Sequence, residues 1–469
     1  MKTQKLLTAP IKSTQMPSGI PYILVNEMAE RFSFYGMRAI LTIFMTKYLM
    51  DVSGSLSAMS EDEAKSIFHL FVSAVYFTPL IGAIIADALF GKYRVVFWLS
   101  LVYCLGHLTL AVMDSWIGIQ IFTWLPLGVD ANRLALFTGL ALIALGSGGI
   151  KPCVSAIVGD QFGETNKHLI EKVYSWFYFS INVGSFLSTL LTPLLLKYYG
   201  PHVAFGVPGV LMAIATLAFW MGRYKFVHIP PAGAGFVKET FSIDGLRSIG
   251  QLFVIYFFVL FFWSLYDQTG SSWVLQAEKM DRQWMGITWE SSQIQAVNPI
   301  LILLFIPLSV SVIYPLINKV YRLTPLRKIG IGMFMTSFSF CIVYWIQLKI
   351  DQGQTPNIAW QLLAYVILTM AEIFVSITCL EFSYTQAPNK MKSFIMAFYL
   401  LSISMGNALT SAVNYFIQNP DGSSKLEGAS YFLFFIMLMT TASIFYAVAA
   451  MFYKEKTFIQ HEAEAPAEE

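Results

Sequence analysis

The sequence predicts an all-α membrane protein with twelve transmembrane helices arranged as two bundles of six. Of its 469 residues, 56% are apolar and only 12% are charged, whereas a soluble protein carries about 25% charged residues. The mean hydropathy is +0.61, and apolar segments long enough to cross a bilayer recur along the chain. So few charges cannot cover a soluble surface of this size, which excludes a secreted domain, a cytosolic enzyme and a nucleic-acid-binding protein.

The individual spans follow from the length that a membrane helix needs, about 20 mostly apolar residues. Twelve segments meet this length, at residues 21–49, 64–91, 93–113, 133–158, 172–196, 203–222, 250–278, 291–318, 325–348, 357–387, 389–417 and 428–453. The amphipathic stretch 115–132 contains Pro126, and we interpret it as a re-entrant or interfacial loop. Residues 1–19 contain lysines but no apolar core, so no cleavable signal peptide is expected.

The longest polar connector divides the chain into two halves. We predict an N-terminal bundle over residues 1–222, a cytoplasmic linker over 223–249, a C-terminal bundle over 250–453 and a polar tail over 454–469, which is the layout of transporters built from repeated bundles. The side of the membrane that holds both termini collects 19 basic residues and the other side 8. The positive-inside rule therefore predicts that both termini are cytoplasmic.

The first span carries charges that a lipid-facing helix would not tolerate. Glu27, Glu30, Arg31 and Arg38 would each cost about 2.5–3.5 kcal/mol at the bilayer centre. Glu27, Arg31, Tyr35 and Arg38 are spaced as one helical stripe, and Glu27 can pair with Arg31 one turn later. The stripe indicates an internal polar cavity. The alternative is a set of buried ion pairs that only hold helices together.

Other spans add further ionisable groups. The fourth span contains Lys151, the seventh Asp267, and the tenth Glu372 and Glu381. A cavity with cations on one wall and an acid on the other suits a zwitterion. The second span contains His69, which could serve proton transfer or be a hydrogen-bonded packing residue.

Motifs for other chemistry are missing from the sequence. There is no GxxxxGK[ST] phosphate loop, no HExxH or Cys/His cluster and no GxSxG elbow, so neither ATP-driven pumping nor metal or nucleophilic catalysis is indicated. We therefore expect no cofactor, no metal and no enzymatic activity.

Several motifs resemble those of one family. Residues 27–36 (EMAERFSFYG) resemble the ExxERFxYYG motif of the proton-coupled oligopeptide transporters, a branch of the major facilitator superfamily. Residues 82–91 (GAIIADALFG), 148–153 (GGIKPC) and 177–185 (FYFSINVGS) are similar to further segments of that family, in the same order. Residues 262–273 and 380–388 look like the animal-type members.

The resemblance implies the major facilitator fold and proton-driven uptake of di- and tripeptides by alternating access. The peptide would lie between the bundles near the midplane, its carboxylate held by Arg31 and Lys151 and its amino terminus by Glu372. The substrate-binding residues implied are Arg31, Tyr35, Arg38, Tyr76, Lys151, Asn182, Asn298, Glu372 and Tyr399. The proton-coupling residues implied are Glu27, Glu30, Arg31, His69 and Asp267.

The chain departs from the family pattern at three positions. Phe34 replaces the first Tyr of the YYG element, Tyr399 stands where Trp is common, and Ser272 stands where animal members often have Arg. The last difference predicts that an ion pair used for gating is missing there.

Two other functions stay open: a proton-coupled antiporter of the same superfamily that exports drugs or other small molecules, and a channel or sensor whose buried charges are structural. The expected partners are peptides, protons and lipid, and the expected location is a bacterial inner membrane.

Overall fold

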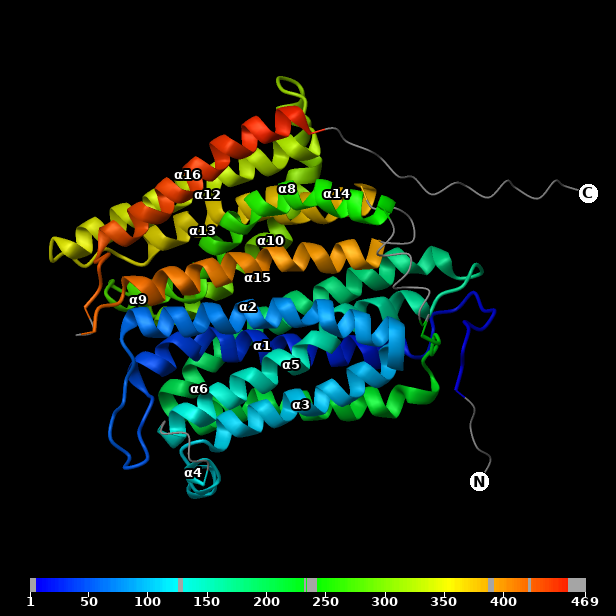
Figure 1. Ribbon diagram of the computed structural model, residues 1–469, viewed down its shortest axis with the longest axis horizontal. Helices are drawn as coiled ribbons and strands as arrows, with labels where there is room; N and C mark the ends of the chain where they lie inside the picture. Colours follow the sequence, from blue (N-terminus) through cyan, green and yellow to red (C-terminus); the bar gives the residue numbers. More distant parts are fainter. Residues whose placement is uncertain are drawn as a thin grey trace, which may run out of the picture.

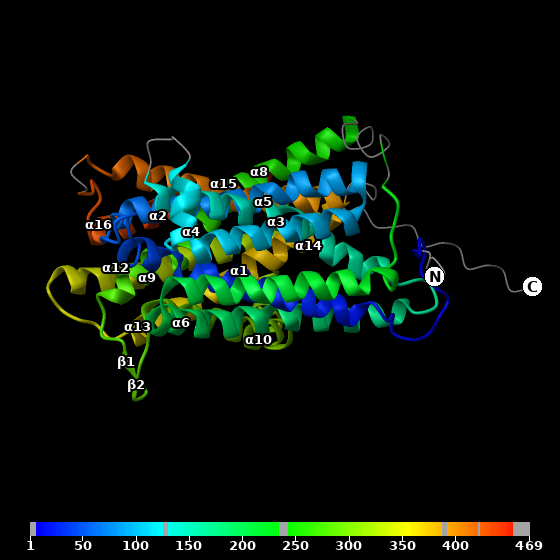
Figure 2. The same cartoon turned by 90° about the horizontal axis from the view of Figure 1, so that it is seen from below.

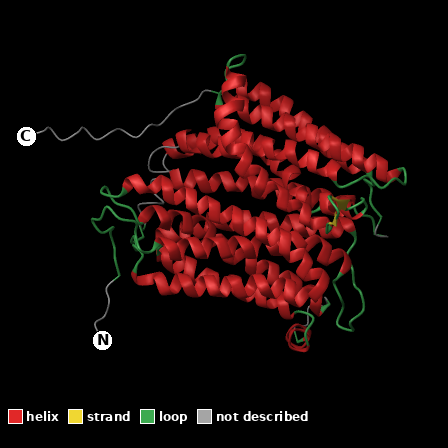
Figure 3. Cartoon of the chain, turned by 180° about the vertical axis from the view of Figure 1, so that it is seen from behind, coloured by secondary structure: helices red, strands yellow, loops and turns green. Residues whose placement is uncertain are grey.

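The computed structural model describes residues 6–124, 130–231, 233, 243–386, 392–420 and 423–453. This part of the chain is almost entirely helical, with one two-stranded antiparallel hairpin (Figure 3). The expected polar tail, 454–469, and residues 232 and 234–242 of the expected linker lie outside the described residues.

The first half of the chain forms five long helices and a short one (Figure 1). Their bounds, with the short 3-10 and π-helical segments marked η, are α1 (Ile20–Lys47), α2 (Glu61–Ile85), η1 (Ala86–Phe90), α3 (Lys92–Val112), α4 (Trp116–Thr123), α5 (Ala131–Asp160), η2 (Lys167–Leu169), α6 (Ile170–Met221) and η3 (Gly222–Tyr224).

The second half is more interrupted. Its elements are α8 (Ile243–Tyr266), η4 (Asp267–Gly270), α9 (Ser272–Glu278), β1 (Gln283–Trp284), β2 (Ile287–Thr288), η5 (Ser291–Ala296), α10 (Val297–Leu308), η6 (Ser309–Ile313), α11 (Tyr314–Asn318), α12 (Pro325–Asp351), α13 (Ala359–Glu372), η7 (Ile373–Ile377), α14 (Thr378–Gln386), α15 (Lys392–Ile417) and α16 (Ala429–Phe452).

The helices agree with the expected spans except at a few places. Within the described residues, nine helical segments are long and apolar enough to cross a membrane, and α1 is not among them because of its charged side chains. Helix α6 runs through two expected spans, and Gly200, with φ +79°, breaks the helical backbone between them. A glycine tolerates this left-handed conformation without steric cost.

Two connectors differ from expectation. The stretch expected as a re-entrant or interfacial loop contains the short helix α4. Trp116 at its start and Trp124 directly after its end are exposed. Helix α8 begins at Ile243, inside the expected linker 223–249, because Ile243, Leu246 and Ile249 extend the apolar helical pattern toward the amino terminus.

The buried apolar side chains form two separate clusters. One is built from residues 20–226 together with Val274, and the other from residues 252–446. We call the corresponding helix groups the N-terminal bundle (α1–α6) and the C-terminal bundle (α8–α16); they lie side by side in Figure 1. The end at which α1 finishes and α2 begins is called the joined end, because side chains of both bundles meet there. The N-terminal segment and the end of α16 lie at the other end (Figure 1).

Glycines bring helices of the N-terminal bundle into backbone contact. A Cβ atom on Gly184 of α6 would lie 2.5 Å from the Met28 carbonyl oxygen of α1. A Cβ atom on Gly82 of α2 would lie 2.3 Å from the Gly148 carbonyl oxygen of α5. The first approach holds α1 against α6 beside Arg31, and the second holds α2 against α5.

Candidate functional site

A cavity of about 330 Å³ lies between the two bundles near the middle of the helices. Eight of the residues expected at the site line it: Tyr35, Arg38, Tyr76, Asn182, Asp267, Asn298, Glu372 and Tyr399. The other five expected residues are Glu27, Glu30, Arg31, His69 and Lys151, and they do not belong to its lining. The two sets of residues therefore have different positions relative to the cavity.

The α1 motif forms a buried ion cluster beside the cavity. Arg31 Nε lies 2.7 Å from Glu27 Oε1 and 3.3 Å from Glu30 Oε2, and both glutamate side chains are fully buried. The pair between Glu27 and Arg31 that the spacing predicts is present, and Glu30 shares the same guanidinium. Within this cluster two buried carboxylates face one guanidinium.

Lys151 of α5 has no anionic partner in the described part of the chain. Its Nζ is buried without a hydrogen bond and lies 3.9 Å from the ring centre of Phe34 and 4.3 Å from that of Tyr76. Tyr76 lines the cavity, so the ammonium group lies directly behind the cavity wall. Cation–π contacts offset part of the cost of burying this charge and leave its hydrogen-bond donors free for an incoming anion.

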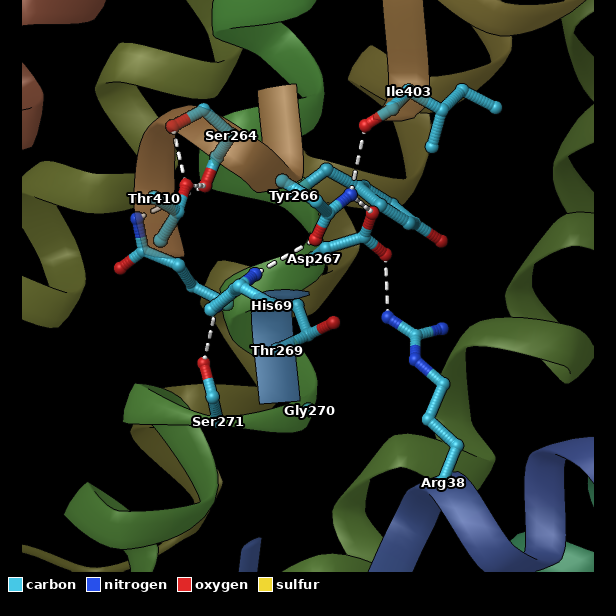
Figure 4. Close-up of polar contacts among 12 residues, drawn as sticks. Arg38, His69, Ser264, Tyr266, Asp267, Thr269, Gly270, Ser271, Ile403 and Thr410 are labelled. Atoms are coloured by element: carbon cyan, nitrogen blue, oxygen red, sulfur yellow. Dashed lines mark hydrogen bonds and ion pairs between the residues drawn. The ribbon is translucent and has the colours of Figure 1, made fainter. Parts of the chain in front are cut away.

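A polar network crosses between the bundles at Asp267 (Figure 4). Arg38 forms an ion pair with one carboxylate oxygen of Asp267, and Asn407 Nδ2 donates to the other at 2.6 Å. His69 Nδ1 lies 2.7 Å from Asn407 Oδ1, and its Nε2 lies 2.8 Å from Ser271 Oγ. Because Asn407 Oδ1 accepts, a neutral His69 carries its proton on Nδ1 and accepts from the serine hydroxyl. Arg38, Asp267 and His69 are thus coupled through one amide.

Glu372 lies on the C-terminal wall of the cavity. Its Oε2 accepts hydrogen bonds from Tyr266 Oη and Asn298 Nδ2, each at 2.8 Å. Both donors are neutral, and within the described residues no basic side chain forms an ion pair with this carboxylate. Glu372 is therefore an acidic group on the cavity wall with no paired cation in that part of the chain.

Helices α2 and α15 are joined across the bundle interface by a row of small polar residues. The pairs, in order from the joined end toward the middle, are Ser66–Ser411, His69–Asn407 and Ser73–Ser404. In each serine pair a hydroxyl also donates to the facing backbone. Ser411 Oγ donates to the Ser66 carbonyl oxygen at 2.8 Å, and Ser404 Oγ donates to the Ser73 carbonyl oxygen at 2.9 Å. We call these three pairs the α2–α15 ladder.

Asn407 and Tyr266 are central to the site and were not among the expected residues. Both side chains are uncharged, whereas buried charge was the sequence feature that indicated the site. A signal does exist in the sequence: Ser404, Asn407 and Ser411 recur at helical spacing in an otherwise apolar span. A polar stripe of this kind marks the face of α15 that meets another helix.

Replacing Asn407 with leucine is expected to lower the stability of the protein by about 1–3 kcal/mol, because Asp267 and His69 would each lose a buried hydrogen bond. The measurement is the thermal unfolding temperature in detergent. Asn414→Leu is the matched control, since Asn414 Nδ2 donates within its own helix to Thr410. Equal unfolding temperatures for the two variants would contradict this role of Asn407.

Comparison with known proteins relates this chain to transporters. A family model described as POT family matches residues 93–243 and 234–431. Mouse solute carrier family 15 member 2 is 35% identical over 415 residues, which cover 80% of this chain and 55% of that protein. Peptide transporter 3 of Caenorhabditis elegans is 35% identical over 382 residues, which cover 73% of this chain and 52% of that protein. The chain thus spans about half the length of these curated relatives.

Solved structures are similar over nearly the whole chain. An auto-inhibited POT family peptide transporter has a TM-score of 0.83 and 33% identity, covering 95% of this chain and 99% of that one. The POT family transporter PepTSo has a TM-score of 0.83 and 37% identity, covering 94% of this chain and 99% of that one.

Proposed function

Because the chain belongs to the POT family, we propose that it carries di- and tripeptides across a membrane together with protons, by alternating access to the cavity between its bundles. The observation that carries this proposal is the division of charge around the cavity. Lys151 lies behind one wall without an anionic partner, and Glu372 lies on the other without a basic one, within the described residues. A zwitterionic peptide satisfies both.

The two ends of the peptide would be recognised by opposite bundles. Its carboxylate would bind Lys151 and Arg31 on the N-terminal side, and its ammonium group would bind Glu372. Asn182 and Asn298 line the cavity and present amide groups that can hydrogen-bond the peptide backbone. A ligand that contacts both bundles favours conformations in which they are close, which links its binding to the transport cycle.

The proton would act through the Arg31 cluster. Glu27 and Glu30 compete for the same guanidinium, so protonating one of them loosens its hold on Arg31. The freed guanidinium can then bind the peptide carboxylate, which couples the two ligands through one set of contacts. The Arg38–Asp267–Asn407–His69 network would be the second titratable element, at the interface that separates when the bundles part.

The membrane orientation is part of the same proposal. Both termini would be cytoplasmic in a bacterial inner membrane, so the joined end would face outward. Ion pairs between the bundles occur at that end, Lys279–Glu61 at 2.7 Å and Lys197–Glu290 at 2.5 Å. They would hold the outer side closed in this conformation.

The test is uptake of a labelled dipeptide into proteoliposomes with and without an imposed proton gradient. Saturable accumulation above the external concentration, only with the gradient inward, supports symport. Peptide accumulation driven by an outward-directed proton gradient would instead indicate antiport. Non-saturable equilibration of the peptide would indicate a channel.

Replacing Glu372 with glutamine is expected to remove the preference for a free amino terminus. The side chain keeps its shape and loses the charge that an ammonium group needs, so affinity falls roughly 10- to 150-fold, for about 1.5–3 kcal/mol. The measurement is inhibition of uptake by free and N-acetylated dipeptides. Glu381→Gln, further along the same span and exposed, is the control. An unchanged preference in Glu372→Gln would move the amine site elsewhere, with Asp267 the next candidate.

A further inference from the structure

A second cavity, of about 430 Å³, opens sideways on the surface of the molecule where the two bundles meet. It is lined by Phe186 and Leu190 of α6, by Trp284 and Trp289 of the hairpin segment, and by Val297 and Leu301 of α10. Its size lies within the range of about 300–1,000 Å³ typical of small-molecule sites. We call it the lateral groove.

The lateral groove is bounded by both bundles. Gln293 and Leu190 both line it, and Gln293 Nε2 donates to the Leu190 carbonyl oxygen at 2.8 Å across the interface. Ile300 and Val366, also in the lining, are partly exposed on its outer side. An apolar groove that is open to the surface of a membrane-spanning bundle faces lipid chains.

The hairpin beside the groove carries exposed apolar side chains. Strands β1 and β2 project sideways from the bundles near the joined end (Figure 2). Trp284, Met285 and Ile287 are exposed there, Met285 to 77%. Tryptophan and exposed apolar residues at the level of the helix ends are typical of the membrane–water interface.

A group of paired acidic and basic side chains lies next to the hairpin. Lys197 Nζ lies 2.5 Å and Arg282 3.6 Å from oxygens of Glu290, the residue after Trp289. Arg282 and Lys47 also share Glu278. Three basic side chains share these two glutamates, and the neighbouring Asp281 carboxylate accepts hydrogen bonds from Gln283 N and Asn357 Nδ2. Lys197 is 45% exposed, and the ammonium and guanidinium groups each have more donors than these ion pairs use, which a phosphodiester can accept from.

We propose that the lateral groove binds one acyl chain of an anionic glycerophospholipid, with its phosphodiester at Lys197 and Arg282. The groove exists only while α6 lies against α10, so the bound lipid stabilises the conformation in which the bundles meet at the joined end. The bilayer itself supplies the ligand, and its anionic lipid content sets the population of that conformation.

Binding is tested by native mass spectrometry of the full chain titrated with phosphatidylglycerol or phosphatidylcholine. Wild type should retain phosphatidylglycerol at least roughly tenfold more tightly than phosphatidylcholine, the discrimination expected for one charge-assisted contact. Val366→Trp, which fills the groove, should lose this binding, whereas Leu363→Trp, also exposed on the same helix α13 but outside the lining, should not. Equal retention by the two tryptophan variants, or equal affinity for the two lipids, overturns the assignment.

The proposed contact between the phosphodiester and Arg282 is tested by a separate variant. Arg282→Gln removes a positive charge and leaves the Lys197–Glu290 pair between the bundles in place. It should weaken phosphatidylglycerol binding, and Lys349→Gln, at the same end of the molecule on α12, should not. An unchanged affinity in Arg282→Gln would contradict the proposed position of the headgroup.

The conformational consequence is tested by electron paramagnetic resonance distances in nanodiscs. Spin labels at Val52 and Gln354, exposed at the joined end of opposite bundles, are placed in a background without the four native cysteines. Adding phosphatidylglycerol to phosphatidylcholine nanodiscs should shift the distribution of label-to-label distances toward the shorter distances of a closed joined end. Val366→Trp should abolish this shift. A distribution that is insensitive to the lipid overturns the coupling, whatever the transport activity.

Discussion

Replacing Lys151 with alanine is expected to abolish concentrative dipeptide uptake while leaving the fold nearly intact. The ammonium group is buried without a hydrogen-bond partner in the described structure, so its removal breaks no hydrogen bond or ion pair in that part of the chain. The loss of a charge-assisted hydrogen bond to the peptide carboxylate costs about 1.5–3 kcal/mol, which is roughly 10- to 150-fold in affinity. The measurements are uptake into proteoliposomes and the thermal unfolding temperature.

The chemical control for Lys151 is on the substrate. Amidating the carboxyl terminus of the dipeptide should weaken its binding to the wild type by a similar factor and cause little further loss in Lys151→Ala. Cys153→Ala, on the same helix and also buried, controls for local repacking. If the wild type binds amidated and free dipeptides equally, the carboxylate is not recognised here.

Replacing either glutamate of the Arg31 cluster with glutamine is expected to affect net uptake and peptide exchange differently. In Glu27→Gln or Glu30→Gln, gradient-driven accumulation should be lost and exchange of labelled for unlabelled peptide should continue. Exchange needs only reorientation of the loaded carrier, whereas net uptake also needs the empty carrier to return after releasing its proton. Both modes are measured in the same vesicles, as proton-driven uptake and as counterflow.

The control for this separation is Glu63→Gln. Glu63 pairs with Arg133 at 2.8 Å within the N-terminal bundle and away from the cavity, so its neutralisation should affect neither mode. A Glu27 or Glu30 variant that still accumulates peptide with the wild-type pH dependence would remove that glutamate from the proton path. His69 and Asp267 would then be tested.

Local features of the sequence predicted much of the fold and of the α1 cluster. Apolar length located most of the long helices because a membrane helix needs about 20 mostly apolar residues. The spacing of Glu27 and Arg31 predicted their contact because both lie on one helix, and helical geometry fixes the distance between adjacent turns.

Contacts between helices could not be predicted in the same way. The pairing of Arg38 with Asp267 joins residues 229 positions apart, and no periodicity within a span encodes such a contact. Glu30 also shares Arg31, although its spacing gave no preference for it. Lys151 lacks a hydrogen-bond partner in the described part of the chain because Phe34 and Tyr76 lie around its ammonium group. Only the packing of three helices determines where these rings lie.

The α2–α15 ladder has a consequence for how easily the bundles separate. Within the N-terminal bundle, glycines such as Gly82 put backbone against backbone, and water cannot replace such dry contacts without leaving voids. The ladder instead consists of hydroxyl, amide and imidazole groups, and such bonds are worth only about 0.6 kcal/mol each between membrane helices. Water entering the seam can take over every one of these hydrogen bonds. Water can therefore replace the contacts of the α2–α15 ladder between the bundles but not the glycine contacts within the N-terminal bundle. Hydration of the ladder lets the bundles part at low cost while each bundle stays intact.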